Sequence, residues 1–179
     1  MNREEVIAAT RLWLERAVIG LNLCPFAAAV YRGGRVRFRV SDQKFASGLL
    51  QELCSELLFL NGADPQECET TLLIHPDVLR DFVDYNEFLG VCDAAIADAG
   101  LEGELQVAGF HPEFQFAGTQ PADIENYTNR SPYPMLHLLR EASIERAVAA
   151  APDTQEIYER NIRTLQSLGH EGWRKLWRD

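Results

Sequence analysis

Three strand-like segments, each separated from the next by one helical segment, constrain the fold of this chain more than any other feature. Residues 35–40 alternate arginine with valine or phenylalanine, which is typical of a strand with one face in the core. Residues 70–75 and 104–111 are the other strand candidates, and apolar spacing predicts helices over 42–60 and 81–99. Strands that alternate with single helices require crossover connections and favour a largely parallel sheet.

Further helices are predicted at both ends of the chain. A first helix begins at Asn2 and is stopped by Gly20, and Pro25 is placed to open a short second one. Residues 134–150 are predicted to be helical. The last long helix begins at a capping pair of Asp153 and Glu156, ends at Gly169, and is followed by an aromatic tail. We expect that tail to pack on the body of the protein or on a partner subunit through Trp173, Leu176 and Trp177.

The fold class follows from this order of elements. We expect an α/β fold in which residues 1–179 form a single domain. Its sheet is expected to be small, largely parallel or mixed, with three to four strands packed by about five helices. An α+β arrangement with a mixed sheet is the alternative.

Charge and cysteine usage exclude several classes of partner. The formal net charge is −10 at pH 7, so we expect no binding to the phosphate backbone of nucleic acids and none to anionic membranes. No two cysteines form a Cys-x-x-Cys pair, and the N-terminus lacks a signal-peptide pattern. We therefore expect a cytoplasmic protein with reduced thiols at Cys24, Cys54, Cys68 and Cys92.

The segment between the third strand and the helix predicted at 134–150 has no helical or strand period over most of its length. An irregular segment of about twenty residues in a compact domain is usually functional or disordered. Phe114, Phe116, Tyr127 and Tyr133 provide apolar anchors, which argues against disorder. Because imidazole, guanidinium, hydroxyl and amide groups gather around it, this segment is the first candidate for a site.

Two of the strands end in the same dipeptide, His75-Pro76 and His111-Pro112. If the strands are parallel, both imidazoles emerge at one edge of the sheet, where α/β proteins bind ligands. The pair then suits acid–base catalysis or a metal site, with Cys24 as a third ligand or a nucleophile. The alternatives are that each histidine only closes its strand by a hydrogen bond to a neighbouring loop, and that Cys24 is a small core residue.

The predicted helix start near Pro134 is the second candidate. Free N–H groups at a helix N-terminus bind anions, and Arg130, His137 and Arg140 would surround such an anion. The alternative is that Arg140 pairs with a structural carboxylate and that His137 is a core imidazole. Further substrate contacts, or a lid over the site, are predicted for Asn126, Tyr127 and Asn129.

The first strand carries three arginines on one face, Arg35, Arg37 and Arg39. The functional interpretation is that Arg37 and Arg39 form a wall of an anion pocket, with a guanidinium forked onto a carboxylate or phosphate. The alternative is a solvated sheet face. The sequence patterns of nucleotide-binding loops, serine hydrolases and zinc peptidases are absent.

Four segments carry a resemblance to a known family. The chain resembles the bacterial family catalogued as domain of unknown function 1415 in Gly-Leu-Asn-Leu-Cys-Pro-Phe (20–26), Leu-Leu-Ile-His-Pro (72–76), Phe-His-Pro-Glu-Phe-Gln-Phe-Ala-Gly (110–118) and Glu-Asn-Tyr-Thr-Asn-Arg-Ser-Pro-Tyr-Pro-Met-Leu-His-Leu-Leu-Arg-Glu (125–141). The resemblance extends over essentially the whole chain. It implies one domain and brings neither an activity nor catalytic residues with it.

Three functional hypotheses follow. In the first, the protein is an enzyme that acts on a small anionic metabolite, with or without one divalent metal ion as cofactor. In the second, it is a non-catalytic module that binds a metal ion or an anion. In the third, it is a structural or interaction protein that can form a homo-oligomer. The interface is then made by the long segment together with Trp173 and Trp177.

Overall fold

The computed structural model describes residues 2–150 and 154–178. Helices account for more of this part of the chain than strands do. In chain order, the elements are α1 (Arg3–Trp13), a π-helix η1 (Leu14–Ile19), α2 (Ala27–Arg32), β1 (Val36–Val40), α3 (Ala46–Gly62), β2 (Thr70–Ile74), α4 (Phe82–Asp98), β3 (Leu105–Phe110), a 3-10 helix η2 (Ile124–Thr128), β4 (Met135–Arg140), α5 (Glu141–Ala150) and α6 (Thr154–Lys175).

The four strands form one mixed sheet in the order β1-β2-β4-β3. Strands β1 and β2 are parallel, whereas β4 runs antiparallel to both of its neighbours. The chain therefore runs in the same direction along β1, β2 and β3, and β4 is inserted between the last two. The expected α/β fold with a small mixed sheet is confirmed.

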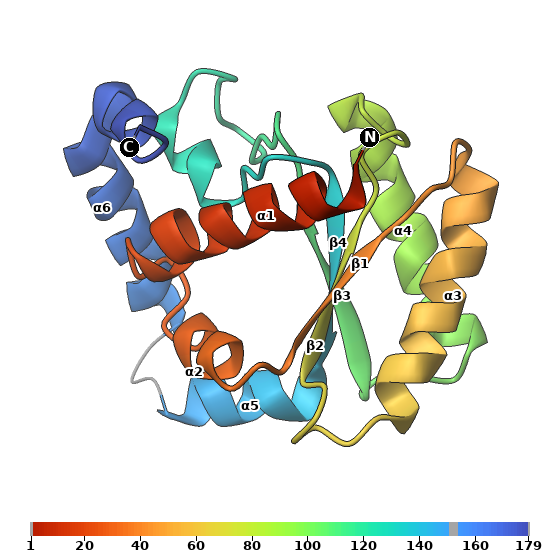
Figure 1. Ribbon diagram of the computed structural model, residues 1–179. Coiled ribbons are helices and arrows are strands. Elements are labelled where there is room, and N and C mark those ends of the chain that lie inside the picture. The colour runs from red at the N-terminus through yellow and green to blue at the C-terminus, as the bar shows by residue number, and fades with distance from the viewer. Residues whose placement is uncertain (1, 151–153, 179) are drawn as a thin grey trace.

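Helices cover both faces of the sheet (Figure 1). On one face, α3 and α4 bury a cluster that includes Leu53, Tyr85 and Leu138. On the other face, α1, η1 and α6 bury a second cluster that includes Trp13 and Met135. Because β2 and β4 are central and covered on both sides, their residues are largely apolar, as in fully buried strands.

Several predicted boundaries agree with the structure. The Asn2 side chain accepts a hydrogen bond from the backbone N–H of Glu4 and so caps α1. Asp81 caps α4 in the same way, through the N–H groups of Val83 and Asp84. The predicted start of α3 was wrong, because Ser41 instead accepts from the N–H of Gln43 in a local turn and the helix begins only at Ala46.

The predicted helix over 134–150 is the main correction. Its first part is strand β4, and only α5 is helical. Met135, Leu136 and Leu138 are fully buried between two strands and two helical layers. Since a short, nearly continuous apolar run is compatible with either a helix or a fully buried strand, periodicity alone does not separate them.

The C-terminal helix α6 contains a kink at Gly169, where φ is 62°. This left-handed backbone confirms the predicted end of the long helix at that glycine. The short helical piece beyond it places Trp173 against Tyr127, with ring centroids 5.0 Å apart, so the aromatic tail does pack on the body of the protein. The proposed capping residue Asp153 lies outside the described residues.

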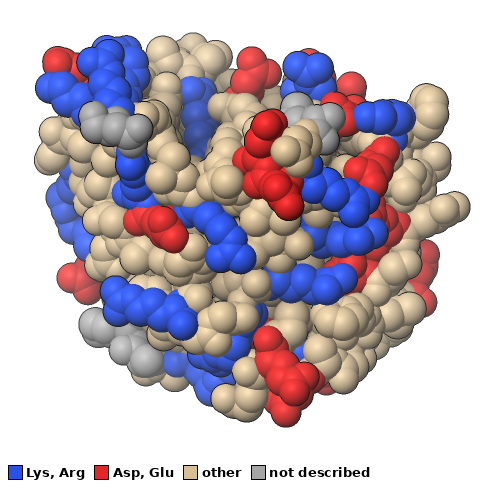
Figure 2. Space-filling model, in the orientation of Figure 1, with Lys and Arg blue, Asp and Glu red and all other residues tan. Residues whose placement is uncertain are grey.

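Charged side chains of both signs are scattered among uncharged ones on the face shown in Figure 2. Lys and Arg are at least as prominent there as Asp and Glu, so the acidic excess of the composition is not visible on this face. Within residues 2–150 and 154–178, no helix combines the length and apolar character needed to span a bilayer.

Candidate functional site

The two strand-end histidines do emerge at one edge of the sheet. His75 directly follows β2 and His111 directly follows β3, and these strands point the same way on either side of β4. Both imidazoles lie against the ring of Tyr85 on α4, with centroid distances of 5.9 Å and 4.9 Å. The sheet therefore brings both histidines into contact with one buried phenol.

Each imidazole is hydrogen-bonded to the loop between β2 and α4. Nδ1 of His75 lies 2.9 Å from the carbonyl oxygen of Val78, and Nε2 of His111 lies 3.3 Å from that of Leu79. Leu79 has a φ of 54°, which is an uncommon backbone conformation for leucine. The two histidines thus hold this strained loop by adjacent carbonyl groups, as the alternative interpretation from the sequence anticipated.

The tautomers of the two rings follow from their partners. The backbone N–H of Glu113 donates to Nδ1 of His111, so the proton of that ring is on Nε2. His75 must donate from Nδ1 to a carbonyl, which leaves its Nε2 without a partner in the protein interior. Because burial disfavours the charged ring, the pKa of His75 is lowered to about 4 and that of His111 is lowered as well.

Neither strand-end histidine reaches solvent. Both side chains are 0 % exposed, so in this conformation they have no access to a substrate outside the protein. A general acid or base must lie within hydrogen-bonding reach of the group that it protonates or deprotonates. The catalytic role of His75 and His111 remains a prediction, and their observed contacts are structural.

Cys24, predicted as a third ligand, and His137, predicted for the helix start, do not lie beside the two strand-end histidines. His137 on β4 lies opposite Leu72, on the sheet face covered by α1, and packs against Phe110 at a centroid distance of 5.9 Å. Loss of solvation lowers the pKa of His137 to about 4. Cys24 packs against the core cluster on that same face. The structure therefore does not assemble His75, His111 and Cys24 into one metal site.

A search of the rest of the described structure gives no metal site either. Within residues 2–150 and 154–178, no three side chains of the histidine, cysteine, aspartate and glutamate types lie close enough together to hold a metal ion.

The long segment between β3 and β4 is ordered around Asn126, which is fully buried. Its Oδ1 accepts from the N–H of Phe116 and from the hydroxyl of Thr119, and its Nδ2 donates to the carbonyl of Gln120. These contacts use three of the four hydrogen bonds that an amide can form. Asn126 therefore stabilises the loop and has little capacity left for a substrate.

The neighbouring Asn129 also has a structural partner. Its Nδ2 donates to the carbonyl of Gly109 at 3.0 Å, and its own carbonyl accepts from the backbone N–H of His111 at 3.2 Å. Asn129 thereby holds the beginning of β4 beside the end of β3.

Arg130 is positioned from three directions. Its Nε donates to the carbonyl of Phe114 at 3.3 Å, and Nη2 donates to that of Pro121 at 2.6 Å. The guanidinium carbon lies 4.3 Å from the ring centroid of Tyr127, which is a cation–π geometry. Nη1 has no acceptor among the described residues, so part of this cation remains available to a ligand.

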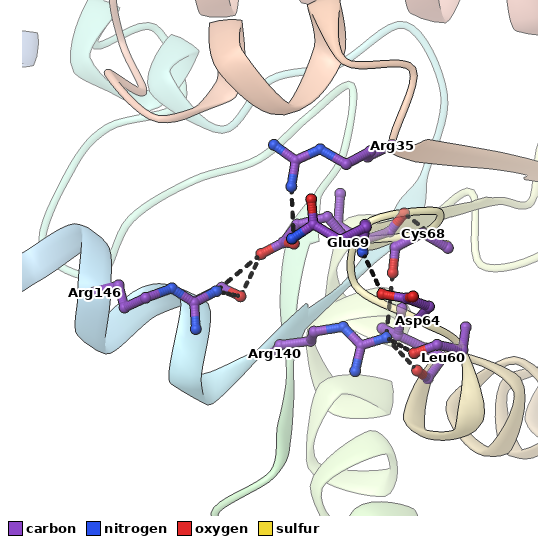
Figure 3. Close-up of polar contacts among 11 residues, drawn as sticks. Arg35, Leu60, Asp64, Cys68, Glu69, Arg140 and Arg146 are labelled. Carbon is purple, nitrogen blue, oxygen red and sulfur yellow. Dashed lines mark hydrogen bonds and ion pairs between the residues drawn. The ribbon is translucent and has the colours of Figure 1, made fainter.

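Arg140 directly precedes α5, which begins at Glu141 and not near Pro134 as predicted, and its guanidinium contacts the end of α3 and the turn before β2. It ends β4, and its Nη2 donates to the carbonyls of Leu60, Ala63 and Cys68 (Figure 3). Two of these carbonyls belong to the last turn of α3 and its cap, where a cation is favourable. Because His137 and Arg140 belong to a strand and point to opposite faces, they cannot share one ligand.

Arg37 and Arg39 are already paired with carboxylates. Arg37 forms a two-point contact with Glu56, at 2.8 Å and 3.1 Å, and Arg39 lies 2.8 Å from Glu52. The glutamates belong to α3, which packs over this face of β1. Each guanidinium is thus paired with a carboxylate that α3 supplies, although the side chains of Arg37 and Arg39 remain 37 % and 39 % exposed. Their role as a wall of an anion pocket stays a prediction.

An aromatic cleft of about 380 Å³ lies where the long segment meets α1 and α6. We define the aromatic cleft by its six principal lining residues, Trp13, Pro112, Tyr127, Arg130, Trp173 and Trp177. Arg130 is the only charged side chain among the described residues that line it. Trp173 meets Tyr127 and Trp177 edge to face, with centroid distances of 5.0 Å and 5.5 Å.

This composition determines what the aromatic cleft can hold. Aromatic walls favour a flat apolar group, and the guanidinium of Arg130 favours a negative charge. A pocket that is mostly apolar with a few polar groups is the usual form of a small-molecule site. Tyr127 and Arg130 were predictable site residues, whereas Trp13 was not, because its spacing in α1 is that of an ordinary core residue.

A comparison with protein families gives one match. A family model described as a protein of unknown function (DUF1415) matches residues 5–175. No curated protein matches the chain, and no solved structure does. The match includes every residue that lines the aromatic cleft except Trp177.

Proposed function

The chain belongs to this family of proteins of unknown function, and we propose that it binds a small planar anion, such as an aromatic carboxylate, in the aromatic cleft. The observation that carries the proposal is the placement of Arg130 among the aromatic rings. Its guanidinium lies over Tyr127, and one of its nitrogens has no acceptor within residues 2–150 and 154–178. The proposal therefore follows the hypothesis of a non-catalytic anion-binding module.

Two further features support a ligand of this kind. Among the described residues that line the cleft, Arg130 alone is charged, so the cleft attracts an anion locally although the chain as a whole is acidic. Arg130 is held by carbonyl groups and by an aromatic face, not by a carboxylate. Its positive charge is therefore not cancelled by a partner, and an arriving carboxylate gains a charge-assisted hydrogen bond.

The tryptophans provide a direct test, because all three in the chain line the aromatic cleft. Benzoate and 2-naphthoate are titrated against the protein by calorimetry and tryptophan emission. Benzamide is the neutral ligand of matched shape, and benzylammonium is the cationic one. We expect saturable binding of the acids that changes the emission, binding of benzamide about tenfold weaker or more, and none of the cation. Equal affinity for benzoate and benzamide, or no saturable binding of either acid, would overturn the proposal.

Matched variants locate the site. Arg130→Gln is expected to weaken benzoate binding about tenfold or more, since a charge-assisted hydrogen bond contributes about 1.5–3 kcal/mol. Arg174→Gln, which removes an exposed positive charge outside the cleft, is expected to bind benzoate as the wild type does. Trp177→Ala removes a half-exposed wall with little risk to folding and is expected to weaken binding of 2-naphthoate more than that of benzoate.

Self-association is a second candidate function, favoured by one observation. At the rim of the aromatic cleft, Leu12 and Trp177 are each 37 % exposed, which is a large exposure for two apolar side chains in one place. In that case a second copy would cover the cleft. Analytical ultracentrifugation of the wild type and of Trp177→Ala at increasing protein concentration tests this self-association. A dimer that persists in the variant would exclude this surface as the interface.

The location of the protein is also part of the proposal. All four cysteines are free thiols, which supports a reducing compartment such as the cytoplasm. An enzymatic activity on a small anionic metabolite, with or without a divalent metal ion, remains a prediction that no observed contact favours. A nucleic acid and a membrane surface remain unexpected partners for a chain of this charge.

A further inference from the structure

A second groove, of about 600 Å³, lies between α2, α5 and the turn that precedes β2. One wall is apolar and comes from the short α2 region: Pro25, Phe26, Ala29 and Val30. The facing wall is polar and carries two guanidinium groups, those of Arg35 and Arg146. We call this the two-arginine groove.

The two arginines converge on one buried carboxylate (Figure 3). Arg35 Nη1 lies 3.3 Å from Glu69, and Arg146 Nη2 lies 3.5 Å from it. The hydroxyl of Ser143 donates to the same carboxylate, and Arg146 Nη2 donates to that hydroxyl at 2.8 Å. The Glu69 side chain is 10 % exposed, so both cations are fixed at the groove by a group that is itself held in place.

The charges of the two-arginine groove do not cancel. Arg35, Glu69 and Arg146 are its only charged residues among the described lining residues, so two cations face one anion. Both contacts to Glu69 are long for charge-assisted hydrogen bonds. The nitrogens of Arg35 and Arg146 that do not contact Glu69 or Ser143 have no acceptor in the described part of the chain. One unsatisfied positive charge therefore lies beside an apolar wall.

We propose that the two-arginine groove is a second binding site, which takes a small amphiphilic anion: a single carboxylate or phosphate head group that carries a short apolar tail. The head group accepts from the outward N–H groups of Arg35 and Arg146. The tail lies along Phe26, Ala29 and Val30. Glu69 sets the spacing of the two guanidiniums.

The site is independent of the aromatic cleft. Its residues come from different segments, and no tryptophan lines it. A ligand in the two-arginine groove should therefore leave tryptophan emission unchanged, whereas a ligand in the aromatic cleft should alter it. Failure of one site can thus be distinguished from failure of the other.

The test uses four probes that share one tail: hexanoate, hexyl phosphate, hexanol and hexylammonium. Calorimetry gives the affinities, and tryptophan emission is recorded in parallel. We expect at least one of the two anions to bind without a change in emission, hexanol to bind at least tenfold more weakly, and hexylammonium not to bind. The comparison of hexanoate with hexyl phosphate assigns the head group. Hexanol binding as tightly as both anions, or an absence of binding by both anions, would overturn the proposal.

Variants complete the test. Arg146→Gln is expected to weaken anion binding about tenfold or more, and its side chain is 66 % exposed, so folding is not at risk. Arg35→Gln is expected to have an effect of similar size. Arg163→Gln is the matched control, since Arg163 is 63 % exposed on α6 and does not line the groove. If Arg146→Gln and Arg163→Gln change the affinity equally, the effect is one of net charge and the proposed site is wrong.

Discussion

The indole N–H of Trp13 donates to the main-chain carbonyl of Arg130 at 2.8 Å, across 117 residues of sequence. This bond fixes the first helix to the segment that carries the aromatic cleft. The side chain of Arg130 is held on the other side by the carbonyls of Phe114 and Pro121. The orientation of Arg130 in the cleft therefore depends on the packing of α1 against the segment between β3 and β4 and on contacts within that segment.

Trp13→Phe tests this connection. The variant keeps an aromatic ring but leaves the carbonyl of Arg130 without its donor, so we expect a loss of about 1–3 kcal/mol in the free energy of unfolding. Urea denaturation followed by circular dichroism measures it. Trp177→Phe, at a side chain that is 37 % exposed, is the control and is expected to stay within about 0.5 kcal/mol. Equal stability of the two variants would show that the bond contributes nothing.

Asn126→Ala is expected to loosen the long segment. Two acceptor contacts and one donor contact are lost at a fully buried position, so we expect a cost of about 2–4 kcal/mol and faster proteolysis within residues 112–123. Asn129→Ala loses one side-chain bond, to Gly109, and is expected to cost about 1 kcal/mol. Limited proteolysis and urea denaturation give both values. An Asn126→Ala variant no weaker than Asn129→Ala would contradict the central role of Asn126.

Arg140→Lys separates a structural arginine from a ligand-binding one. Lysine keeps the positive charge, but its shorter side chain does not place an N–H group where Nη2 of Arg140 contacts three carbonyls around the end of α3. We expect a loss of about 1–3 kcal/mol in unfolding free energy with no change in benzoate affinity. Calorimetry on the folded variant checks the affinity. A selective loss of anion binding at unchanged stability would restore Arg140 as a site residue.

Buried neutral histidines make stability depend on pH. The pKa of His75 is about 4 in the folded protein, against 6.5 for the unperturbed imidazole, so the unfolded chain binds a proton that the folded one does not. Stability is therefore fully present above about pH 6.5 and falls as the pH drops towards 4, by ~1.4 kcal/mol per pH unit for each such histidine.

His75→Gln checks the sign and size of this dependence. The amide keeps an N–H donor for the carbonyl of Val78 but does not titrate, so urea denaturation between pH 6.5 and 4.5 should give a slope smaller by about one proton equivalent. The pKa values of His111 and His137 are also lowered, so these two histidines account for the dependence of stability on pH that remains in the variant. An unchanged slope in the variant would mean that His75 is not buried as a neutral ring.

The order of strands and helices up to residue 111 was predictable, because each of those elements has a clear period or cap. Strand β4 was not predictable, because the apolar run that includes Met135, Leu136 and Leu138 is too short to show whether the segment is a helix or a buried strand. That error carried over to the site. Arg140 was assigned to a helix start, whereas the strand directs it to the carbonyls that end α3.

The strand-end histidines show a different limit. Their shared edge followed from the parallel course of β2 and β3 and was predicted correctly. Their burial did not follow, because it depends on Tyr85 and on the loop of Val78 and Leu79 closing over them. The order of elements in the sequence predicts at which edge of the sheet a strand ends. It does not predict which side chains and loops cover that edge.

By itself, the sequence determined the fold class and the number of domains it implies, and it singled out the segment between β3 and β4 as a candidate site, since these rest on local periods and on the chemistry of neighbouring residues. Only the tertiary structure decided which polar groups remain available to a ligand. Arg140 and His111 contact carbonyls far along the chain, and Asn126 and His75 contact groups within ten residues, whereas Arg130 keeps a nitrogen without an acceptor among the described residues at the aromatic cleft. The physical reason is that a buried donor or acceptor must find a partner, and which partner it finds is set by packing between elements and not by the neighbouring sequence.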